Sequence, residues 1–387
     1  MNIKRLESRN SGIELLRIIA ILLITLHHYA LYGIITPLNP ESGVNLFRQG
    51  GNLRQLVTWF FYSGGDIGNI IFFLITGFFL INSKRTDFKR FVLEIFFYSF
   101  LTLCIFSINT FFFEGSFYRT ISHDEKVKSF WAYLVAPFSS SRFWFCTAYI
   151  AIVFVSPLLN AILQKINRKG FIVLLSVFYI PFIALGTYYV YPYLGFTKAL
   201  YFYSLGAYIK LFSTDTNKKK RLLFFYILVF VLSIFCYGVI RLGIDKDFPI
   251  VFWQKHRFNH FFALQLTYGV FATICAVSLL KFFALFEFKN KIVNFISSTT
   301  LGVYLLQEGL FGRTLIFGHL LNILQTQYFK NLYPLYALIT VLIIFFICCF
   351  IDIIRQLVFE PVYLFCYEKF VFFYNKHFVL ESTCVNE

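Results

Sequence analysis

Apolar segments long enough to cross a bilayer recur along the whole chain of 387 residues. A helix rises 1.5 Å per residue, so about 20 residues span the roughly 30 Å hydrocarbon core. The first such segment covers residues 11–32. Nine more follow, at residues 66–82, 91–113, 143–163, 171–190, 196–212, 222–241, 261–280, 292–311 and 335–355. The pattern predicts an all-α, polytopic integral membrane protein with about ten transmembrane helices.

Basic residues between these segments predict the orientation of the chain. If the N-terminus lies in the cytoplasm, most of the 35 Lys and Arg residues fall in cytoplasmic segments, although the outside loops are longer. This distribution follows the positive-inside rule, so both termini are expected to be cytoplasmic. Residues 1–356 are predicted to form one membrane-embedded domain. Residues 357–387 mix aromatic and charged side chains, and we expect a tail at the cytoplasmic membrane interface.

Composition supports a membrane protein and excludes soluble classes. Hydrophobic residues make up 58% of the chain and charged residues only 14%, with a mean hydropathy of +0.70. A soluble fold of this length cannot bury so much apolar surface, so membrane lipids are expected partners. The net charge of +16 suggests nucleic-acid binding, but the basic residues lie in short loops between spans. There they set topology, and no nucleic-acid partner is expected.

Cysteine and histidine spacing gives no sign of a metal site. The eight cysteines show no CxxC and no Cys/His ligand pattern, and most lie inside apolar segments. We therefore expect neither a structural disulfide nor a bound metal. His256 and His260 have the i,i+4 spacing of two metal ligands, but no third ligand accompanies them, so a solvated loop is the expected setting.

The first apolar segment contains four ionisable residues, Glu14, Arg17, His27 and His28. A charged side chain near the centre of a membrane helix costs on the order of 2.5–3.5 kcal/mol, which favours a functional role. His28 follows Arg17 by eleven residues, about 20° beyond three full turns, so the two share a face and lie about 16 Å apart. Glu14 lies on the same face, and His27 points elsewhere. The simpler alternatives are that Glu14 and Arg17 reach the headgroups and that a His forms an interhelical hydrogen bond.

The spacing of Glu14, Arg17 and His28 resembles the signature of the family 3 membrane acyltransferases, integral membrane proteins that O-acylate carbohydrates. In that family an acidic residue precedes the Arg by three positions, and the Arg precedes an essential His by eleven. His28 therefore carries over, and His27 does not. The resemblance implies ten spans in the plasma membrane. It also implies transfer of an acetyl group from cytoplasmic acetyl-CoA to a hydroxyl of a cell-surface polysaccharide or its lipid-linked precursor.

Later segments contain weaker matches to the same family. The second span has the family's Phe-Phe and Ser-Gly positions, with Thr in place of Ser, at Phe72, Phe73, Thr76 and Gly77. Helix packing is the simpler role for these residues. The fourth span matches family landmarks at Trp144, Tyr149 and Pro157. The resemblance makes Trp144 and Tyr149 candidate substrate-binding residues, although an aromatic belt also accounts for Trp144. In the ninth span Gln307 replaces a family His, and it can supply the hydrogen bonds of that His but not its titration.

A short basic segment follows the second span and contains Lys84, Arg85, Lys89 and Arg90. Such a cluster sets topology in any polytopic protein. Its ammonium and guanidinium groups are also the usual phosphate binders, which would suit coenzyme A. Many family members carry a basic-x-x-Arg motif here, and this chain departs from that spacing, with Arg90 the nearest candidate. The candidate donor-binding residues are Arg17, Arg85, Lys89 and Arg90.

The candidate catalytic residues are His28 and Glu14. We expect His28 to act as general base on the acceptor hydroxyl, or to carry the acyl group briefly. Glu14 is expected to pair with Arg17 and offset its burial. A further set of charged residues lies near predicted helix ends and is expected to be interfacial unless the fold brings its members together. This set is Arg142, Arg241, Glu308, Arg313 and Asp352.

Two other function classes stay open at this stage. A polysaccharide polymerase or flippase would also be a Phe-rich protein of ten spans with buried charges. A transporter of protons or small solutes could use Glu14, Arg17 and His28 as a relay. A transporter should also show paired broken helices in its two halves, and no such pairing is evident in the sequence.

Overall fold

The computed structural model describes residues 9–35, 46–83, 89–112, 143–179, 194–212, 219–245, 266–309, 312–313, 316–317 and 325–378. Within these ranges the chain is almost entirely helical and contains no strand, which confirms the all-α prediction. The N-terminal half contains α2 (Ser11–Ala30), η1 (Leu31–Ile35), α3 (Leu46–Gln49), α4 (Asn52–Leu80), α5 (Lys89–Phe112), α7 (Trp144–Leu163) and α8 (Arg168–Tyr179). The C-terminal half contains α10 (Leu194–Phe212), α11 (Lys219–Asp245), η5 (Leu266–Phe271), α13 (Ala272–Ala284), α14 (Lys291–Ser297), α15 (Thr300–Glu308), η7 (Gln325–Phe329), α18 (Tyr333–Ile354), η8 (Arg355–Phe359) and α19 (Glu360–Phe378).

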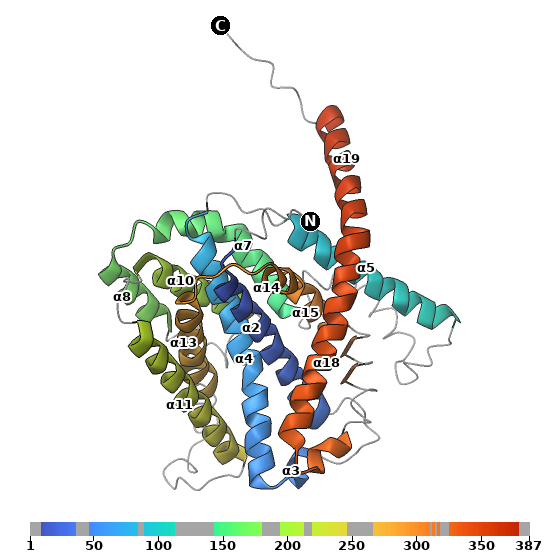
Figure 1. Ribbon diagram of the computed structural model, residues 1–387. Coiled ribbons are helices and arrows are strands. Elements are labelled where there is room, and N and C mark those ends of the chain that lie inside the picture. The colour runs from blue at the N-terminus through green and yellow to red at the C-terminus, as the bar shows by residue number, and fades with distance from the viewer. Residues whose placement is uncertain are drawn as a thin grey trace.

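Helices α2 and α4 lie side by side at the centre of the structure, and α10 packs on α4 (Figure 1). Glycines let these backbones approach closely. A Cβ atom at Gly68 would lie 2.6 Å from the carbonyl oxygen of Ala20, and one at Gly77 would overlap the carbonyl oxygen of Tyr203. Small residues at such positions are the usual means of tight packing between membrane helices. The close contact holds α2 in place against its neighbours.

The predicted ninth span, residues 292–311, is a broken helix. Its two parts, α14 and α15, are separated at Ser298 and Thr299. The Asn290 side chain caps α14 by accepting hydrogen bonds from the first two backbone N–H groups that follow residue 291. Ser11, at the start of α2, donates its hydroxyl to Asn294 at 2.8 Å. The break places α14 beside the start of α2 and α15 beside its second half.

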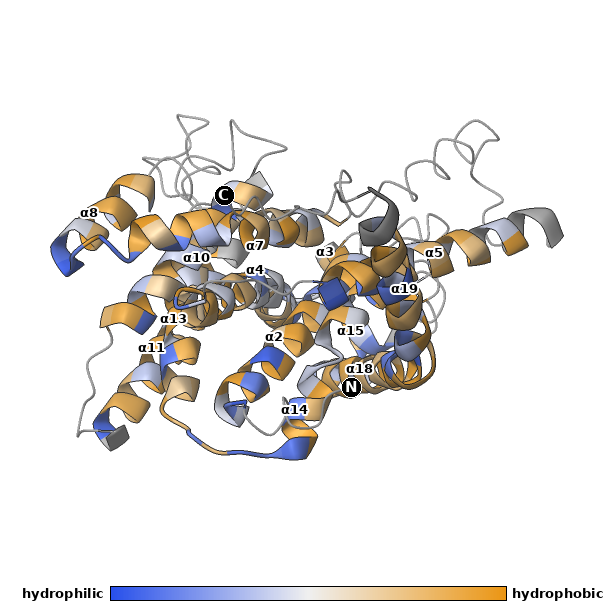
Figure 2. Ribbon diagram, turned by 90° about the horizontal axis from the view of Figure 1, so that it is seen from above, coloured by the Kyte–Doolittle hydropathy of each residue, from blue (hydrophilic) through white to orange (hydrophobic). Residues whose placement is uncertain are grey.

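Five helical stretches in the described part of the chain are long and apolar enough to cross a bilayer. They are Ser11–Ile35, Asn52–Leu80, Trp144–Leu163, Arg221–Ile240 and Tyr333–Tyr374. Apolar positions predominate along the outer helices α5, α8 and α11 (Figure 2). These features are those of a membrane protein. The full set of ten spans and the cytoplasmic termini stay predictions, since the predicted spans 171–190 and 261–280 lie partly outside the described residues.

The C-terminal helix is continuous from Tyr333 to Phe378 through α18, η8 and α19. At 1.5 Å per residue this helix is about 69 Å long, more than twice the bilayer core. The predicted boundary at residue 356 falls inside the π-helical turn η8, and α19 projects beyond the other helices (Figure 1). Lys89 of α5 lies 3.3 Å from Glu368 and stacks on the Tyr367 ring, which ties α19 to α5. The interfacial position of residues 357–387 stays a prediction.

Candidate functional site

A buried ion pair lies near the start of α2. Arg17 donates hydrogen bonds from one Nη1 to both carboxylate oxygens of Glu14, at 2.9 and 3.0 Å. Ser297 of α14 donates its hydroxyl to the same carboxylate, and Arg9 lies 3.7 Å from it. Glu14 is only 3% exposed, and a buried carboxylate needs such partners. The pairing of Glu14 with Arg17 predicted from their spacing is confirmed.

His28 lies near the other end of α2, 6% exposed, and both of its ring nitrogens have polar neighbours. Its Nε2 is 2.8 Å from Oε1 of Glu308, and its Nδ1 is 3.2 Å from Oε1 of Gln307. Both neighbours are the last residues of α15, the second part of the broken helix. The break therefore positions an amide and a carboxylate on one imidazole.

Glu308 has a second partner, which extends the network away from His28. Its Oε2 lies 2.5 Å from Nη2 of Arg313. The same Nη2 donates to the Tyr32 hydroxyl, and the Arg313 guanidinium lies 4.3 Å from the centre of the Tyr32 ring. The Tyr32 and Phe317 rings both pack on the imidazole of His28. Glu308 and Arg313, expected at an interface unless they converged, do converge, and they do so on His28.

His27 contacts different partners from His28. Its Nδ1 lies 2.5 Å from the backbone carbonyl oxygen of Tyr62, and its ring packs against Gly65 of α4. A Cβ atom at Gly65 would collide with this ring, so the glycine makes room for it. The prediction that the two adjacent histidines point in different directions is confirmed.

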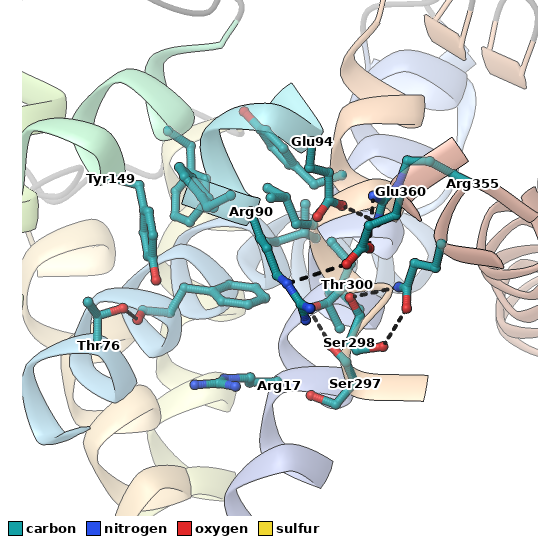
Figure 3. Close-up of a pocket in the computed structure, with 18 of the residues that line it drawn as sticks. Arg17, Thr76, Arg90, Glu94, Tyr149, Ser297, Ser298, Thr300, Arg355 and Glu360 are labelled. Atoms are coloured by element: carbon teal, nitrogen blue, oxygen red, sulfur yellow. Dashed lines mark hydrogen bonds and ion pairs between the residues drawn. The ribbon is translucent and has the colours of Figure 1, made fainter. Parts of the chain in front are cut away.

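A cavity of about 270 Å³ opens beside the Arg17 end of α2. Three of its lining residues come from three different helices: Arg17 from α2, Arg90 from α5 and Tyr149 from α7 (Figure 3). Arg9 and Arg355 also line it, so four guanidinium groups surround this space. Its remaining wall is a mixture of aliphatic, aromatic, hydroxyl, amide and carboxylate side chains. Guanidinium groups can bind an anionic ligand, which here would compete with the carboxylates that pair with them.

The inner end of the cavity approaches His28 without including it. Ile24 of α2 and Tyr304 of α15 both line the cavity. His28 follows Ile24 by four residues, and Glu308 follows Tyr304 by four, so each lies about 6 Å further along its helix. The two helices α2 and α15 thus place His28 and Glu308 one helical turn beyond the inner end of the cavity.

A second ion cluster forms one wall of the cavity. Arg355 is only 2% exposed, and its guanidinium lies 2.6 Å from Asp352, 3.2 Å from Glu94 and 3.5 Å from Glu360. Glu360 in turn lies 3.5 Å from Arg90 at the cavity (Figure 3). Three carboxylates compensate the buried guanidinium, as burial of a charge requires. Asp352, expected near an interface, is fully buried in this cluster.

The other assigned residues divide between inside and outside the cavity. Arg90 and Tyr149 line it together with Arg17, whereas Lys89 lies outside it against α19. Trp144 is exposed at the first position of α7 and does not line the cavity. Several other candidates lie outside the described residues, or have a side chain that does. These are Lys84, Arg85, Arg142, Arg241, His256 and His260.

Glu14 and His28 lie at opposite ends of the site. Fourteen residues of helix separate them, which is about 21 Å along the axis of α2. The partners of Glu14 are Arg17, Arg9 and Ser297. The carboxylate next to the imidazole is that of Glu308. In the described part of the chain, no group of three or more His, Cys, Asp or Glu is placed to hold a metal ion.

Residues 10–353 match a family model described as an acyltransferase domain. No curated protein and no solved structure matches the chain. The matched region contains α2, the broken helix α14–α15 and most of the cavity wall, and it ends just before Arg355.

Proposed function

The chain belongs to the acyltransferase 3 family, and from this premise we propose that it transfers an acetyl group from acetyl-CoA to a carbohydrate hydroxyl. The proposed acceptor is a cell-surface polysaccharide or its lipid-linked precursor, and the proposed location is the plasma membrane. One observation carries the proposal. A histidine with a partner at each ring nitrogen lies one helical turn beyond the inner end of a cavity that four arginines surround.

The arginines suit the anionic part of coenzyme A. Guanidinium groups bind phosphate with paired, charge-assisted hydrogen bonds. We propose that Arg17 and Arg90, which line the cavity from α2 and α5, bind the phosphates. In the free protein Arg17 is held by Glu14 and Arg90 lies near Glu360, so the phosphates would take over from these carboxylates. Arg85 and Lys89 remain candidates for binding the phosphates of coenzyme A outside the cavity.

The size of the cavity suits the narrow part of the donor. Its volume of about 270 Å³ is small for a pocket that encloses a whole cofactor. We therefore place the pantetheine arm inside it, with the nucleotide at its arginine-rich side and the acetyl group beyond its inner end, toward His28. Arg17 and His28 are about 16 Å apart, which an extended pantetheine arm can cover. Tyr149 lines the cavity and is assigned to the donor, and Trp144, outside it, is a proposed acceptor contact.

His28 is the proposed acid–base group. The acceptor oxygen attacks the carbonyl carbon of the thioester, the new C–O bond forms and the C–S bond breaks. The proton of the hydroxyl ends on the sulfur of coenzyme A, and His28 mediates this exchange. A transient acyl group on His28 is the alternative course of the same reaction. Glu14 acts on Arg17 in this scheme, since it lies about 21 Å from His28.

Glycan analysis of four strains tests the proposal. The strains are wild type, a deletion, His28→Ala, and His27→Ala as the neighbouring control. Base-labile acetyl esters are expected in wild type and His27→Ala and should be absent from the other two. Unchanged ester content, with altered polymer length or export in the deletion strain, would contradict acyl transfer and support a polymerase or flippase.

A further inference from the structure

Hydrogen bonds around His28 determine which of its ring nitrogens carries a proton. The Thr25 hydroxyl donates to the backbone carbonyl of Ile21 at 2.9 Å, so its oxygen is free to accept. Nε2 of Gln307 donates to that oxygen at 2.9 Å. This fixes the amide of Gln307 with its Oε1 toward Nδ1 of His28, at 3.2 Å. An amide oxygen only accepts, so Nδ1 must carry a hydrogen.

The other nitrogen of His28 shares a proton with Glu308. Nε2 and the Oε1 of Glu308 are 2.8 Å apart, and two lone pairs would not approach so closely without a hydrogen between them. Arg313 lies 2.5 Å from the other oxygen of the carboxylate. The contact between Nε2 and Oε1 therefore holds one shared proton. Nε2 is also the only nitrogen of His28 that can exchange a proton, because Nδ1 is committed to Gln307.

We propose that Glu308 is a second catalytic residue, the base whose partner acid is His28. This inference rests on the proposed acyl transfer. The Glu308 carboxylate takes the proton of the acceptor hydroxyl as the oxygen bonds to the acyl carbon. The C–S bond breaks, and the proton on Nε2 of His28 passes to the leaving sulfur. Transfer of the new proton from Glu308 to Nε2 across 2.8 Å restores the resting pair, and no other reactant is needed.

The rate of acyl transfer should depend on pH in a specific way. The active pair holds one proton, so a second proton at low pH occupies the base, and loss of the first at high pH removes the acid. The other titratable or charged groups that face the pair are His27 and Tyr32, whose ring centres each lie 5.6 Å from that of His28, and Arg313. Transfer by wild type should follow a bell-shaped pH profile that belongs to the pair, and His27→Ala should keep both limbs. A carboxylate that only held the imidazole in place would not give rise to both the acidic and the alkaline limb of the pH–rate profile.

Each full-length variant is produced in the deletion strain, and membranes from that strain are incubated with radiolabelled acetyl-CoA. The measured quantity is the base-labile label on the endogenous glycan. Glu308→Gln is expected to lower kcat by about 100-fold or more and to lose the bell shape, with an unchanged KM for acetyl-CoA. Glu308→Asp keeps the carboxylate and should recover part of kcat together with both limbs. Glu308 does not line the cavity, so stabilisation of the purified variants by acetyl-CoA reports whether they are folded.

Gln307→Glu provides a second, nearly isosteric variant. A carboxylate at Nδ1 would hold the proton on His28 more strongly and should move the alkaline limb to higher pH. Wild-type rate or both limbs in Glu308→Gln, or an unmoved alkaline limb in Gln307→Glu, would overturn the role of Glu308 while acyl transfer stands. No labelled glycan with wild type at any pH would overturn the proposed function itself.

Discussion

At the scale of single residues, α2 carries both proposed roles of the site, donor binding and acid–base chemistry, along one face. Arg17 lies at the cavity and contacts a carboxylate, whereas His28 lies beyond the inner end of the cavity and contacts an amide and a carboxylate. Sequence spacing alone placed both on one face, because helical periodicity is a local property. If the proposed roles hold, substitutions on this one helix should disturb donor binding and chemistry independently.

Arg17→Gln should raise the KM for acetyl-CoA at least about tenfold and leave kcat nearly unchanged. A charge-assisted hydrogen bond contributes roughly 1.5–3 kcal/mol, and about 1.4 kcal/mol is a factor of ten. Steady-state kinetics with acetyl-CoA as the varied substrate checks this expectation. Lys281→Gln is the matched control, since Lys281 packs over the Tyr226 ring and does not line the cavity, and its KM should stay close to that of wild type. A large fall in kcat for Arg17→Gln would place Arg17 in the chemical step instead.

Glu14→Gln distinguishes the two roles considered for this carboxylate. If Glu14 only holds Arg17, the substitution should leave kcat within about threefold of wild type, since about 21 Å of helix separates it from His28. The KM for acetyl-CoA should change, because Arg17 loses its ionic partner. A fall in kcat as large as that of His28→Ala would show that Glu14 takes part in the reaction.

The residues that sequence reasoning did not assign to the site share one property. Gln307 and Glu308 reach His28 from 279 or more positions away along the chain, and Arg313 joins through Glu308. A single sequence contains no signal for a contact between such distant positions. The family motif singles out Gln307, whereas the sequence places Glu308 near the end of a predicted helix. The break between α14 and α15 lies inside a continuous apolar run, so hydropathy could not reveal it.

At the scale of elements, the site depends on how closely α2 and α4 pack. The two backbones meet at glycines, and α2 carries both Arg17 and His28, so any shift of α2 moves both ends of the site together. Protein interiors of this density tolerate little added volume. The contact between α2 and α4 is therefore a stability element with a direct effect on function.

Gly68→Ala should destabilise the protein by about 1–3 kcal/mol and lower its Tm in detergent. The added Cβ would lie 2.6 Å from the carbonyl oxygen of Ala20, and backbone cannot move aside as a side chain does. Gly51→Ser, at the N-cap of α4, is the control, since a Cβ there meets nothing within 4 Å and a serine can cap the helix. An unchanged Tm for Gly68→Ala would show that α2 and α4 can separate without cost.

At the scale of the whole molecule, the C-terminal helix belongs to the site as well as to the tail. Arg355 and Glu360 line the cavity, although both follow the family-matched region. Hydropathy ended the last span at residue 355 because polar residues follow, yet those residues are buried in the ion cluster. Hydropathy detects apolar length, but it cannot distinguish an exposed charge from one that a distant helix neutralises. Apolar length is enough to predict the all-helical class. It is not enough to predict this boundary, which depends on the buried ion cluster.

A chain that ends at residue 359 should have a lower Tm and bind acetyl-CoA at least about tenfold more weakly. The truncation removes Glu360 from the cavity wall and leaves the buried Arg355 guanidinium with fewer counter-charges. It also removes the contact of Glu368 with Lys89, so α5, which carries Arg90, loses its support from α19. Stabilisation of the purified protein by acetyl-CoA measures the effect. A chain that ends at residue 378 keeps all of α19 and should behave as full-length protein. Equal donor binding by both truncations would show that α19 makes no contribution to the cavity.

The anchoring of α2 has a consequence for which donors the enzyme accepts. Ser11 hydrogen-bonds to the chain near Phe288 and Asn294, Gly68 packs on the middle of the helix, and Glu308 contacts His28. A helix fixed at three levels cannot slide, so the interval of about 16 Å between Arg17 and His28 acts as a gauge of molecular length. For the proposed reaction, a thioester with a truncated arm engages one end or the other but never both. The length of the donor arm would then determine which thioesters react, independently of how well their nucleotide is bound.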